Sequence, residues 1–343
     1  MKALLYTKPF HFEYGDFPDP EIPPDHVLVR VQACGICGSD VHGYTGTTGR
    51  RIPPLIMGHE AAGIIEDFGK DVKGFRKGDR VCFDSTVYCN HCEACQQGHY
   101  NHCVHREVLG VSIPGSKRNG AFAEFVAVPW WIVSKLPDHL ALTNAALLEP
   151  LSIAVHAANR APLSAKSTVL IIGAGTIGLL LVQSVKLKAV SKVIVSDINE
   201  FRLETAKAFG AEKTVNPQKI DLKEFVLEET DQRGAHVVFE AVGLAKTFHQ
   251  ALAATRPGGH VTLIGNLEKI VEINVQELIS KELTLRGSYA NGGEYRSCVD
   301  LAASGKIQVG PLISEILPLA EGQHAFDRLH RAEENLLKIV LTP

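Results

Sequence analysis

Four cysteines in one short segment have the spacing of a metal site, C-x2-C-x2-C-x7-C: Cys89, Cys92, Cys95 and Cys103. Four thiolates can converge on one tetrahedral ion, and a closed set of this kind leaves no position for water or substrate. The segment therefore predicts a structural zinc site. An iron–sulfur cluster also takes four thiolates, and His91, His99 and His102 lie close enough in the sequence to replace one of them.

Three further segments carry side chains that can bind a metal or move a proton. The first holds Cys34, Cys37, Ser39, Asp40 and His42; the second is His59-Glu60, and the third is Glu149-Pro150. Thiolate, imidazole and carboxylate are all zinc ligands. Spacing does not choose between Cys34 and Cys37, which could also form a redox pair, and a histidine beside a glutamate is often only a structural pair.

A glycine motif points to a dinucleotide. Gly173, Gly175 and Gly178 form G-x-G-x-x-G, with Ile177 inside the motif, directly after the apolar run 169–172 and at the start of a helical pattern. The glycines allow a tight turn, approach of the backbone to a pyrophosphate, and close helix packing. In a chain with a dinucleotide motif and a single four-cysteine segment, zinc is the better interpretation of the four cysteines than an iron–sulfur cluster.

The acidic residue that such a motif requires ends the next strand. Asp197 can accept hydrogen bonds from the ribose hydroxyls of the cofactor and repel a 2′-phosphate, which favours NAD over NADP. Arg202 lies five residues further on and could cover the adenine or tolerate a phosphate. Its alternative interpretation is a charge on the surface of a helix.

These residues need two kinds of framework. Short β-like runs separated by Gly, Pro and Asp fill the first third of the chain, at 27–36, 61–69, 78–83 and 121–128. From about residue 165 apolar strands alternate with amphipathic helices, which predicts a doubly wound parallel sheet. The last fifty residues are expected to be helical and to end in a strand over 334–343 that returns to the first domain.

Composition excludes several classes of protein. The chain has 343 residues, 45% of them hydrophobic, and a net charge of −3, far from the basic balance of a nucleic-acid binder. We find no signal-peptide core and no apolar run long enough to span a bilayer, so we expect a soluble cytoplasmic protein without a nucleic-acid or membrane partner. A zinc-finger role is disfavoured for the same reason, and Cys298 is expected in the core.

Together, these motifs resemble the zinc-containing medium-chain dehydrogenase family over essentially the whole chain. The matching segments are Gly35-Ile36-Cys37-Gly38-Ser39-Asp40-x-His42, Gly58-His59-Glu60-x-x-Gly63, Phe75-x-x-Gly78-Asp79-Arg80-Val81, the cysteine segment, Glu149-Pro150 and Gly173-Ala174-Gly175-x-x-Gly178. The resemblance implies an α/β protein with a GroES-like β-rich catalytic domain (1–152 and 291–343, zinc lobe at about 85–105) and a Rossmann NAD-binding domain (153–290).

The resemblance also implies roles for the candidate residues. Cys37 and His59 would bind a catalytic zinc, which Glu60 and Glu149 reach directly or through water. Asp40 would orient His59, as carboxylates do for metal-bound imidazoles. Ser39 and His42 would carry the proton of the substrate hydroxyl to solvent, while the hydride passes to NAD.

The branch nearest to this chain comprises polyol dehydrogenases, such as sorbitol and galactitol-1-phosphate dehydrogenases, which have an acidic residue at the position of Glu149. We expect oxidation of a secondary hydroxyl of a polyol or sugar alcohol, with or without a phosphate, and Tyr44 and Tyr289 at the substrate unless they are core aromatics. Ser288 departs from the sorbitol pattern. Arg50 and Arg51 are expected to be solvated loop charges, although they could bind a phosphate.

Two other functions stay open at this stage. One is a zinc and NAD dehydrogenase for another secondary alcohol, such as L-threonine or a diol, and the other is a zinc-binding protein without enzymatic activity. A homodimer or homotetramer built through the sheet of the nucleotide domain is expected from the resemblance alone.

Overall fold

The computed structural model describes residues 1–113, 115–332 and 335–343. The chain forms two compact units, one made of Met1–Ser152 and Asn291–Pro343 and the other of Ile153–Ala290. We call them the outer-segment unit and the central unit. The central unit is thus inserted into the sequence of the outer-segment unit.

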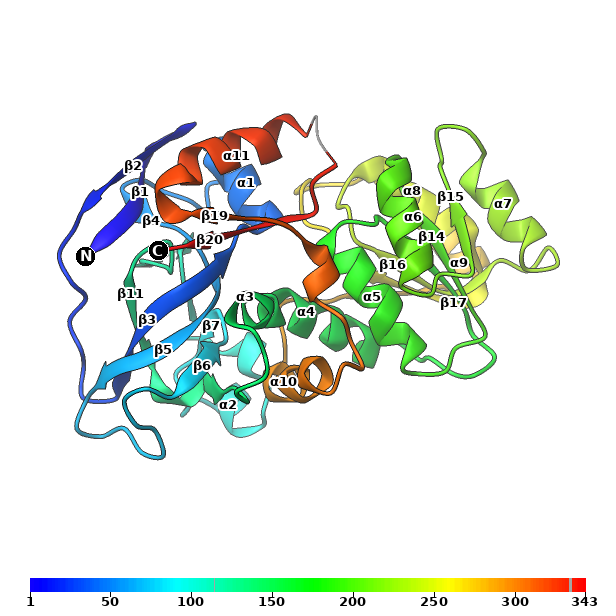
Figure 1. Ribbon diagram of the computed structural model, residues 1–343. Coiled ribbons are helices and arrows are strands. Elements are labelled where there is room, and N and C mark those ends of the chain that lie inside the picture. Colours follow the sequence, from blue (N-terminus) through cyan, green and yellow to red (C-terminus); the bar gives the residue numbers. More distant parts are fainter. Residues whose placement is uncertain (114, 333–334) are drawn as a thin grey trace. The chain divides into compact units, whose positions relative to one another are not determined.

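A seven-stranded sheet organises the outer-segment unit (Figure 1). Its strands follow the order β12-β6-β5-β3-β20-β19, and β11 pairs with β3. The bounds are β3 His26–Gly35, β5 Glu60–Phe68, β6 Arg80–Phe83, β11 Phe125–Pro129, β12 Val133–Lys135, β19 Ile313–Pro318 and β20 Lys338–Thr342.

Shorter elements complete this unit. The small sheets are β2-β1-β4, β10-β9 and β7-β8. Their bounds, with those of the helices, are β1 Lys2–Lys8, β2 His11–Asp16, β4 Leu55–Ile56, β7 Thr86–Val87, β8 Glu107–Val108, β9 Val111–Ile113, β10 Ser116–Arg118, α1 Gly38–Tyr44, α2 Glu93–Gln96, α3 Leu142–Ala146, α10 Tyr295–Ala303 and α11 Gly322–Arg331. Helix α4, Leu148–Arg160, begins in this unit and continues into the central one.

The core of the outer-segment unit follows from alternation along its strands. In β3, Val27, Val29 and Val31 are at most 1% exposed, whereas the residues between them are half-buried, as expected for a strand with one face on the core. The predicted strand at the end of the chain is present: β20 pairs with β3, Val340 opposite Gly35. Residue 334, where that prediction begins, lies outside the described residues. The sequence did not predict β19, which separates the helices of residues 291–343.

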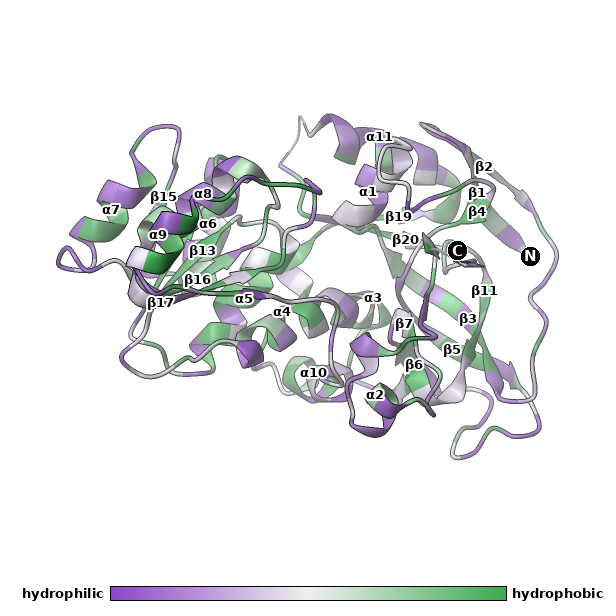
Figure 2. Ribbon diagram, turned by 180° about the vertical axis from the view of Figure 1, so that it is seen from behind, coloured by the Kyte–Doolittle hydropathy of each residue, from purple (hydrophilic) through white to green (hydrophobic). Residues whose placement is uncertain are grey.

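A six-stranded parallel sheet forms the middle of the central unit, in the order β15-β14-β13-β16-β17-β18. The bounds are β13 Thr168–Ile172, β14 Lys192–Ser196, β15 Lys213–Val215, β16 Ala235–Glu240, β17 Thr255–Leu263, β18 Thr284–Gly287, α5 Thr176–Lys186, α6 Glu200–Ala208, α7 Leu222–Glu228, α8 Ala245–Ala254 and α9 Val275–Ser280. Figure 2 shows hydrophobic residues along these strands, and β13 and β14 are buried over nearly their whole length.

Helices cover both faces of this sheet. Helix α5 packs with α6, and α7 packs with α8. The strand order reverses after β15, and crossovers between parallel strands are right-handed, so the two pairs lie on opposite faces. The predicted doubly wound fold is therefore confirmed.

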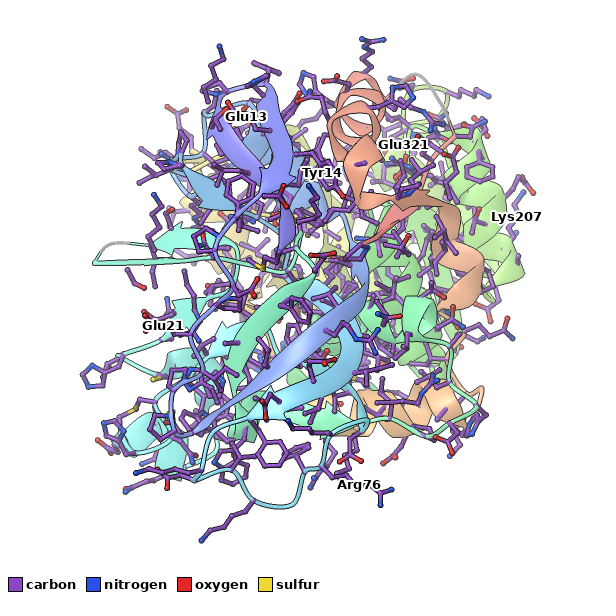
Figure 3. All side chains as sticks on the ribbon, turned by 60° about the vertical axis from the view of Figure 1, so that its left-hand side comes forward. Glu13, Tyr14, Glu21, Arg76, Lys207 and Glu321 are labelled. Carbon is purple, nitrogen blue, oxygen red and sulfur yellow. The ribbon has the colours of Figure 1, made fainter. Side chains whose placement is uncertain are left out.

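The surface carries charges of both signs. Figure 3 shows Glu13, Glu21 and Arg76 pointing outward, and all three are exposed. No helix within the described ranges combines the length and the apolar character that a membrane span requires.

We expect the glycine motif to tolerate substitution at one position and not at another. A Cβ at Gly178 would lie 1.8 Å from the Gly173 carbonyl oxygen, whereas a Cβ at Gly175 meets nothing within 4 Å. Gly178→Ala should therefore lower the free energy of unfolding by about 2–3 kcal/mol, and Gly175→Ala, the matched control, should leave it nearly unchanged. Calorimetric unfolding measures both, and equal stability of the two variants would contradict this packing argument.

Candidate metal centres and dinucleotide motif

Three of the predicted ligands lie together in the outer-segment unit. One ligand atom from each of Cys37, His59 and Glu60 lies within 4.8 Å of the other two. Cys37 is the N-cap of α1, where its sulfur accepts the Ser39 N–H at 3.5 Å. His59 and Glu60 follow Gly58, whose φ of 94° turns the chain into β5 and directs both side chains to the same place.

The two neighbouring cysteines lie in different surroundings. The Cys34 side chain is 1% exposed in the hydrophobic core, and burial raises its pKa well above the usual value. Cys37 lies with His59 instead, and both cysteines are free thiols. The redox-pair interpretation therefore has no support in the geometry.

Asp40 connects His59 with an arginine. Its Oδ2 lies 3.4 Å from His59 Nδ1, and its Oδ1 accepts hydrogen bonds from Arg51 at 2.7 and 3.1 Å. Burial alone would raise the pKa of Asp40, but His59 and Arg51 lower it far below the ordinary value. Likewise, burial lowers the pKa of His59, and Asp40 and Cys37 reverse this effect and raise it.

Arg51 corrects an expectation from the sequence. It is 5% exposed and bound to Asp40 and to Ser39 Oγ (3.3 Å), so it is neither a solvated loop charge nor a free phosphate ligand. Its neighbour Arg50 is exposed, as expected. The sequence does not predict that Arg51 pairs with Asp40. The two residues are eleven positions apart, and Arg51 lies beyond the end of the helix that contains Asp40.

Glu149 reaches the same region from the first turn of α4. Its Oε1 accepts the Ser85 hydroxyl at 2.7 Å, whereas its buried Oε2 has no hydrogen-bond partner among the described residues. Burial raises the pKa of Glu149 to about 7, an effect that His59 opposes and Glu60 strengthens. Glu149 does not belong to the group of ligand atoms within 4.8 Å.

Glu60 has a partner that the sequence did not predict. Lys338, the first residue of β20, donates to both Glu60 oxygens at 2.8 and 2.7 Å. Both side chains are at most 2% exposed. The two residues are separated by 278 positions, so only the sheet brings them together.

The two candidate relay residues flank this group. Ser39 Oγ donates to Cys37 Sγ at 3.3 Å and accepts from Arg51. His42 lies at the surface, where partial burial of the ring and the nearby His330 lower its pKa.

Tyr44, two residues after His42, does not line this site. Its side chain is fully buried against Phe12 and Phe326, and its hydroxyl lies within hydrogen-bond distance of Asp327 Oδ1 (2.7 Å) and of the Phe10 carbonyl oxygen (2.9 Å). The expectation of a substrate contact is therefore wrong for Tyr44, and the core interpretation holds. Tyr289 belongs to the central unit and is 43% exposed.

The donor set fits a zinc ion. Cysteine sulfur, histidine nitrogen and carboxylate oxygen are its ordinary ligands, and His59 has a second carboxylate, Asp40, behind it as metal-bound imidazoles usually do. The buried Glu149 Oε2 without a partner is a further sign, because an orphaned carboxylate oxygen in a dry site is costly.

The four-cysteine segment is a second such group. Sulfur atoms of Cys89, Cys92, Cys95 and Cys103 all lie within 4.8 Å of one another. Backbone amides point at them: the Cys89 N–H donates to Cys103 and the Cys92 N–H to Cys89, each at 3.3 Å. His91, His99 and His102 are not in this group; His91 contacts the Cys89 carbonyl oxygen instead. A closed set of four thiolates fits the structural zinc predicted from the spacing.

The dinucleotide motif joins β13 to α5 in the central unit. Gly173 has a φ of 99°, and Gly175 is the N-cap of α5. Ile177 lies in the first turn of this helix, and a helix N-terminus favours a bound anion. Asp197 follows β14 and accepts the Ala174 N–H at 2.6 Å through Oδ2 and the Asn199 N–H at 2.9 Å through Oδ1. Arg202 lies half-buried in α6.

Comparison with known proteins agrees with this geometry. Residues 23–138 match the family model for the alcohol dehydrogenase GroES-like domain, and residues 176–304 match that for zinc-binding dehydrogenases. A sorbitol dehydrogenase of Bacillus subtilis is 34% identical, with 100% of this chain and 97% of the relative covered.

Two solved structures are similar over the whole chain. One is a zinc-binding dehydrogenase of Sinorhizobium meliloti bound to NADP (33% identity, TM-score 0.91, covering 100% of this chain and 99% of the other). The other is galactitol-1-phosphate dehydrogenase of Escherichia coli (28% identity, TM-score 0.91, covering 100% of each chain).

The chain belongs to the zinc-containing medium-chain alcohol and polyol dehydrogenase family. It is an oxidoreductase that acts on a small-molecule alcohol, with a GroES-like domain and a Rossmann-type domain. The predicted cofactors, zinc and NAD, are those of this family.

A buried carboxyl near this site should make stability depend on pH. Burial raises the pKa of Asp84 to about 6 from its ordinary 3.8, despite hydrogen bonds from Thr86 and Asn291. The folded protein binds the Asp84 proton more tightly than the unfolded chain does. Protonated Asp84 therefore contributes fully to the stability of the folded state below pH 3.8, and this contribution is lost as the pH rises through 6.

We therefore expect the stability of the zinc-loaded wild type relative to Asp84→Asn to fall by about 2 kcal/mol between pH 4 and pH 7. Urea unfolding of both proteins across this range measures the difference. A difference that does not change with pH would show that Asp84 has the same pKa in the folded and unfolded chain.

Proposed function

We propose that this protein oxidises a secondary hydroxyl of a polyol or sugar alcohol to a ketone with NAD, at the site formed by Cys37, His59, Glu60 and Glu149. The observation that carries the proposal is the buried Glu149 Oε2 without a partner. A carboxylate in place of a second thiolate makes the site more polar, and its oxygens can accept hydrogen bonds from the additional hydroxyls of a polyol. The similarity to sorbitol and galactitol-1-phosphate dehydrogenases supports the same substrate class.

The residues of this chain would divide the work as follows. Cys37 and His59 hold the zinc ion, and Asp40 fixes the imidazole through the 3.4 Å contact to Nδ1. When bound, zinc acts as a Lewis acid that lowers the pKa of a substrate hydroxyl. Ser39 Oγ would accept the hydroxyl proton as it gives up its own, and His42, at the surface, would release one proton to solvent, because imidazoles can exchange protons near neutral pH.

The preference for NAD rests on Asp197. Its carboxylate is held at the glycine motif by the Ala174 and Asn199 amides, so a 2′-phosphate placed there would meet a fixed negative charge. The similar structure from Sinorhizobium meliloti is bound to NADP. Arg202 is therefore the residue of this chain through which NADP could be used in addition.

Metal analysis combined with a substrate panel tests the proposed function. We expect two zinc ions per chain, one for each group of ligands. His59→Gln should lose the zinc ion at the Cys37–His59 group and all activity. Cys95→Ser should lose the zinc ion of the four-thiolate group and should lower the stability of the folded protein. Cys298→Ser is the matched control because Cys298 is buried outside both groups.

The substrate panel should contain polyols, polyol phosphates, L-threonine, diols and simple alcohols, each with NAD and with NADP. Reduction of NAD on polyols supports the proposal. Turnover restricted to threonine or a diol would assign the alternative substrate, and one zinc ion per chain without turnover of any alcohol would refute the proposal.

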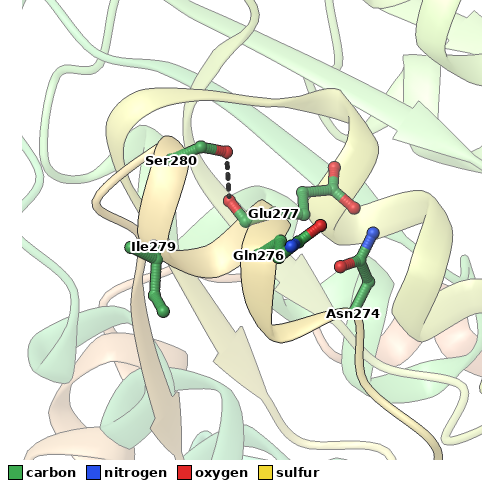
Figure 4. Close-up of a pocket in the computed structure, with 5 residues that line it drawn as sticks. All are labelled: Asn274, Gln276, Glu277, Ile279 and Ser280. Carbon is green, nitrogen blue, oxygen red and sulfur yellow. Dashed lines mark hydrogen bonds between the residues drawn. The ribbon is translucent and has the colours of Figure 1, made fainter.

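We further propose a homo-oligomer in which the sheet of the central unit continues across the interface, and a cytoplasmic location. Among the described residues, strand β18 pairs only with β17. In the segment that precedes β18 in the chain, Ile270, Val275 and Ile279 are 87%, 57% and 70% exposed. Figure 4 shows α9 with Ile279 at the pocket that Asn274, Gln276, Glu277 and Ser280 also line. Exposed apolar side chains beside an unpaired strand are features of an interface.

Ile279→Glu should therefore dissociate the oligomer, because it places a charge in an apolar contact. Ile220→Glu is the control: Ile220 is also exposed in the central unit but lies before α7. Sedimentation velocity distinguishes the two variants. If Ile279→Glu sediments like the wild type, the interface lies elsewhere.

A further inference from the structure

The side chain of Arg256, in the central unit, has a buried nitrogen that no described residue binds. Its Nε is shielded from solvent and has no hydrogen-bond partner among the described residues, and the residue as a whole is half-buried. A guanidinium group has five N–H donors and a permanent positive charge. Because an unpaired donor away from water costs free energy, an acceptor from outside the chain would be stabilising at this position.

The backbone around Arg256 forms a fixed loop. Strands β16 and β17 change register near the start of β16, and residues 256–259 bulge out there. The Gly258 N–H donates to the Lys281 carbonyl oxygen at 2.7 Å, which ties the loop to the end of α9. A Cβ on Gly259 would lie 3.3 Å from Arg256 Cγ, so the arginine side chain passes close to this glycine. The position of the Arg256 side chain is therefore set by its own loop.

The charges that act on two neighbouring histidines are all positive. His236 is in β16 and His260 in β17, and burial lowers the pKa of both. Arg256 and Arg233 lower the pKa of His236 further, and Arg286 and Arg256 do the same for His260. No described carboxylate counteracts them at either ring. The chain has a net charge of −3, so this group does not reflect a general excess of basic residues.

This basic group lies at the other end of the strands from the dinucleotide motif. Strands β13 and β16 are parallel. The glycine motif follows the carboxyl end of β13, whereas His236 is the second residue of β16. A strand of six residues, the length of β16, spans about 20 Å. The basic group is therefore separate from the pyrophosphate position of the cofactor.

We propose that Arg256 is the centre of an anion site that binds a phosphoryl group or a free phosphate ion. A guanidinium group can donate two parallel hydrogen bonds to the oxygens of such an anion, including one from the Nε that lacks a partner. The anion would also offset the repulsion among Arg256, Arg286 and the protonated histidines. This site goes beyond the oxidation of an alcohol and does not depend on it.

Sulfate, a tetrahedral dianion near neutral pH, is the probe for a first test. NAD is present in all samples to occupy the glycine motif, and sodium chloride keeps the ionic strength constant. Sulfate should bind and raise the pKa of His236 and His260, because an anion beside Arg256 stabilises the protonated rings. NMR signals of the histidine rings measure both the affinity and the two pKa values.

Three variants show whether Arg256 carries this binding. Arg256→Met should weaken sulfate binding by about tenfold or more, the scale of a lost charge-assisted hydrogen bond. Arg256→Lys should lie between this variant and the wild type, because it keeps the charge and loses the paired donors. Lys207→Met is the matched control: it removes an exposed positive charge from α6 in the same unit and should bind sulfate like the wild type.

Thermal unfolding separates a ligand site from an arginine with a purely structural role. Without sulfate, Arg256→Met should be at least as stable as the wild type, because it removes an unpaired donor from a group of like charges. Sulfate should then raise the Tm of the wild type more than that of Arg256→Met. The general effect of sulfate on folded proteins is common to both.

Competition with sulfate identifies the source of the anion. Tighter binding of a phosphomonoester than of inorganic phosphate would indicate a phosphorylated metabolite, and equal binding would indicate free phosphate. Malonate, a dianion without a phosphorus centre, should bind more weakly than either. The inference is overturned if Arg256→Met binds sulfate like the wild type, if Lys207→Met loses binding equally, or if malonate competes as well as phosphate.

Discussion

The buried carboxylates near Cys37 and His59 carry more negative charge than one divalent ion can neutralise. The residues around them supply the remaining compensation. Asp40, Glu60 and Glu149 are all at most 4% exposed. Each has its own compensation: Arg51 for Asp40, Lys338 for Glu60, and the Ser85 hydroxyl for one oxygen of Glu149. Removing a partner from such a pair is far more costly than the pair itself is stabilising, because the remaining charge stays buried.

Three carboxylates that look alike in the sequence have different partners. Asp40 contacts His59 and Arg51, Glu60 is bound by Lys338, and among the three only Glu149 has an oxygen that no described residue binds. The hydrogen-bond partners of the candidate ligands therefore influence the chemistry of the site as much as the ligands themselves do.

The sequence allows prediction of residues whose partners lie close in the chain. It also allows prediction of residue types that have few roles in proteins, such as clustered cysteines. Short-range spacing predicts the four-cysteine segment and the glycine motif, because the residues of each set are near neighbours in the chain. The structure places the four sulfur atoms together and puts the glycines at the start of α5. Arg51 and Lys338 could not be predicted, because their partners are set by the pairing of distant strands and loops. Tyr44 was misassigned since its position in the chain, two residues after His42, does not reveal which face of α1 its ring occupies.

The connection of β20 to β3 has a consequence for how the protein is made. Glu60 and Lys338 are 278 positions apart, and the whole central unit is synthesised between them. On the ribosome, Cys37, His59, Glu60 and Glu149 therefore emerge long before Lys338, the cation that pairs with Glu60. A growing chain would hold Glu60 without this partner for most of its synthesis, and the ion pair can form only after β20 has joined the sheet.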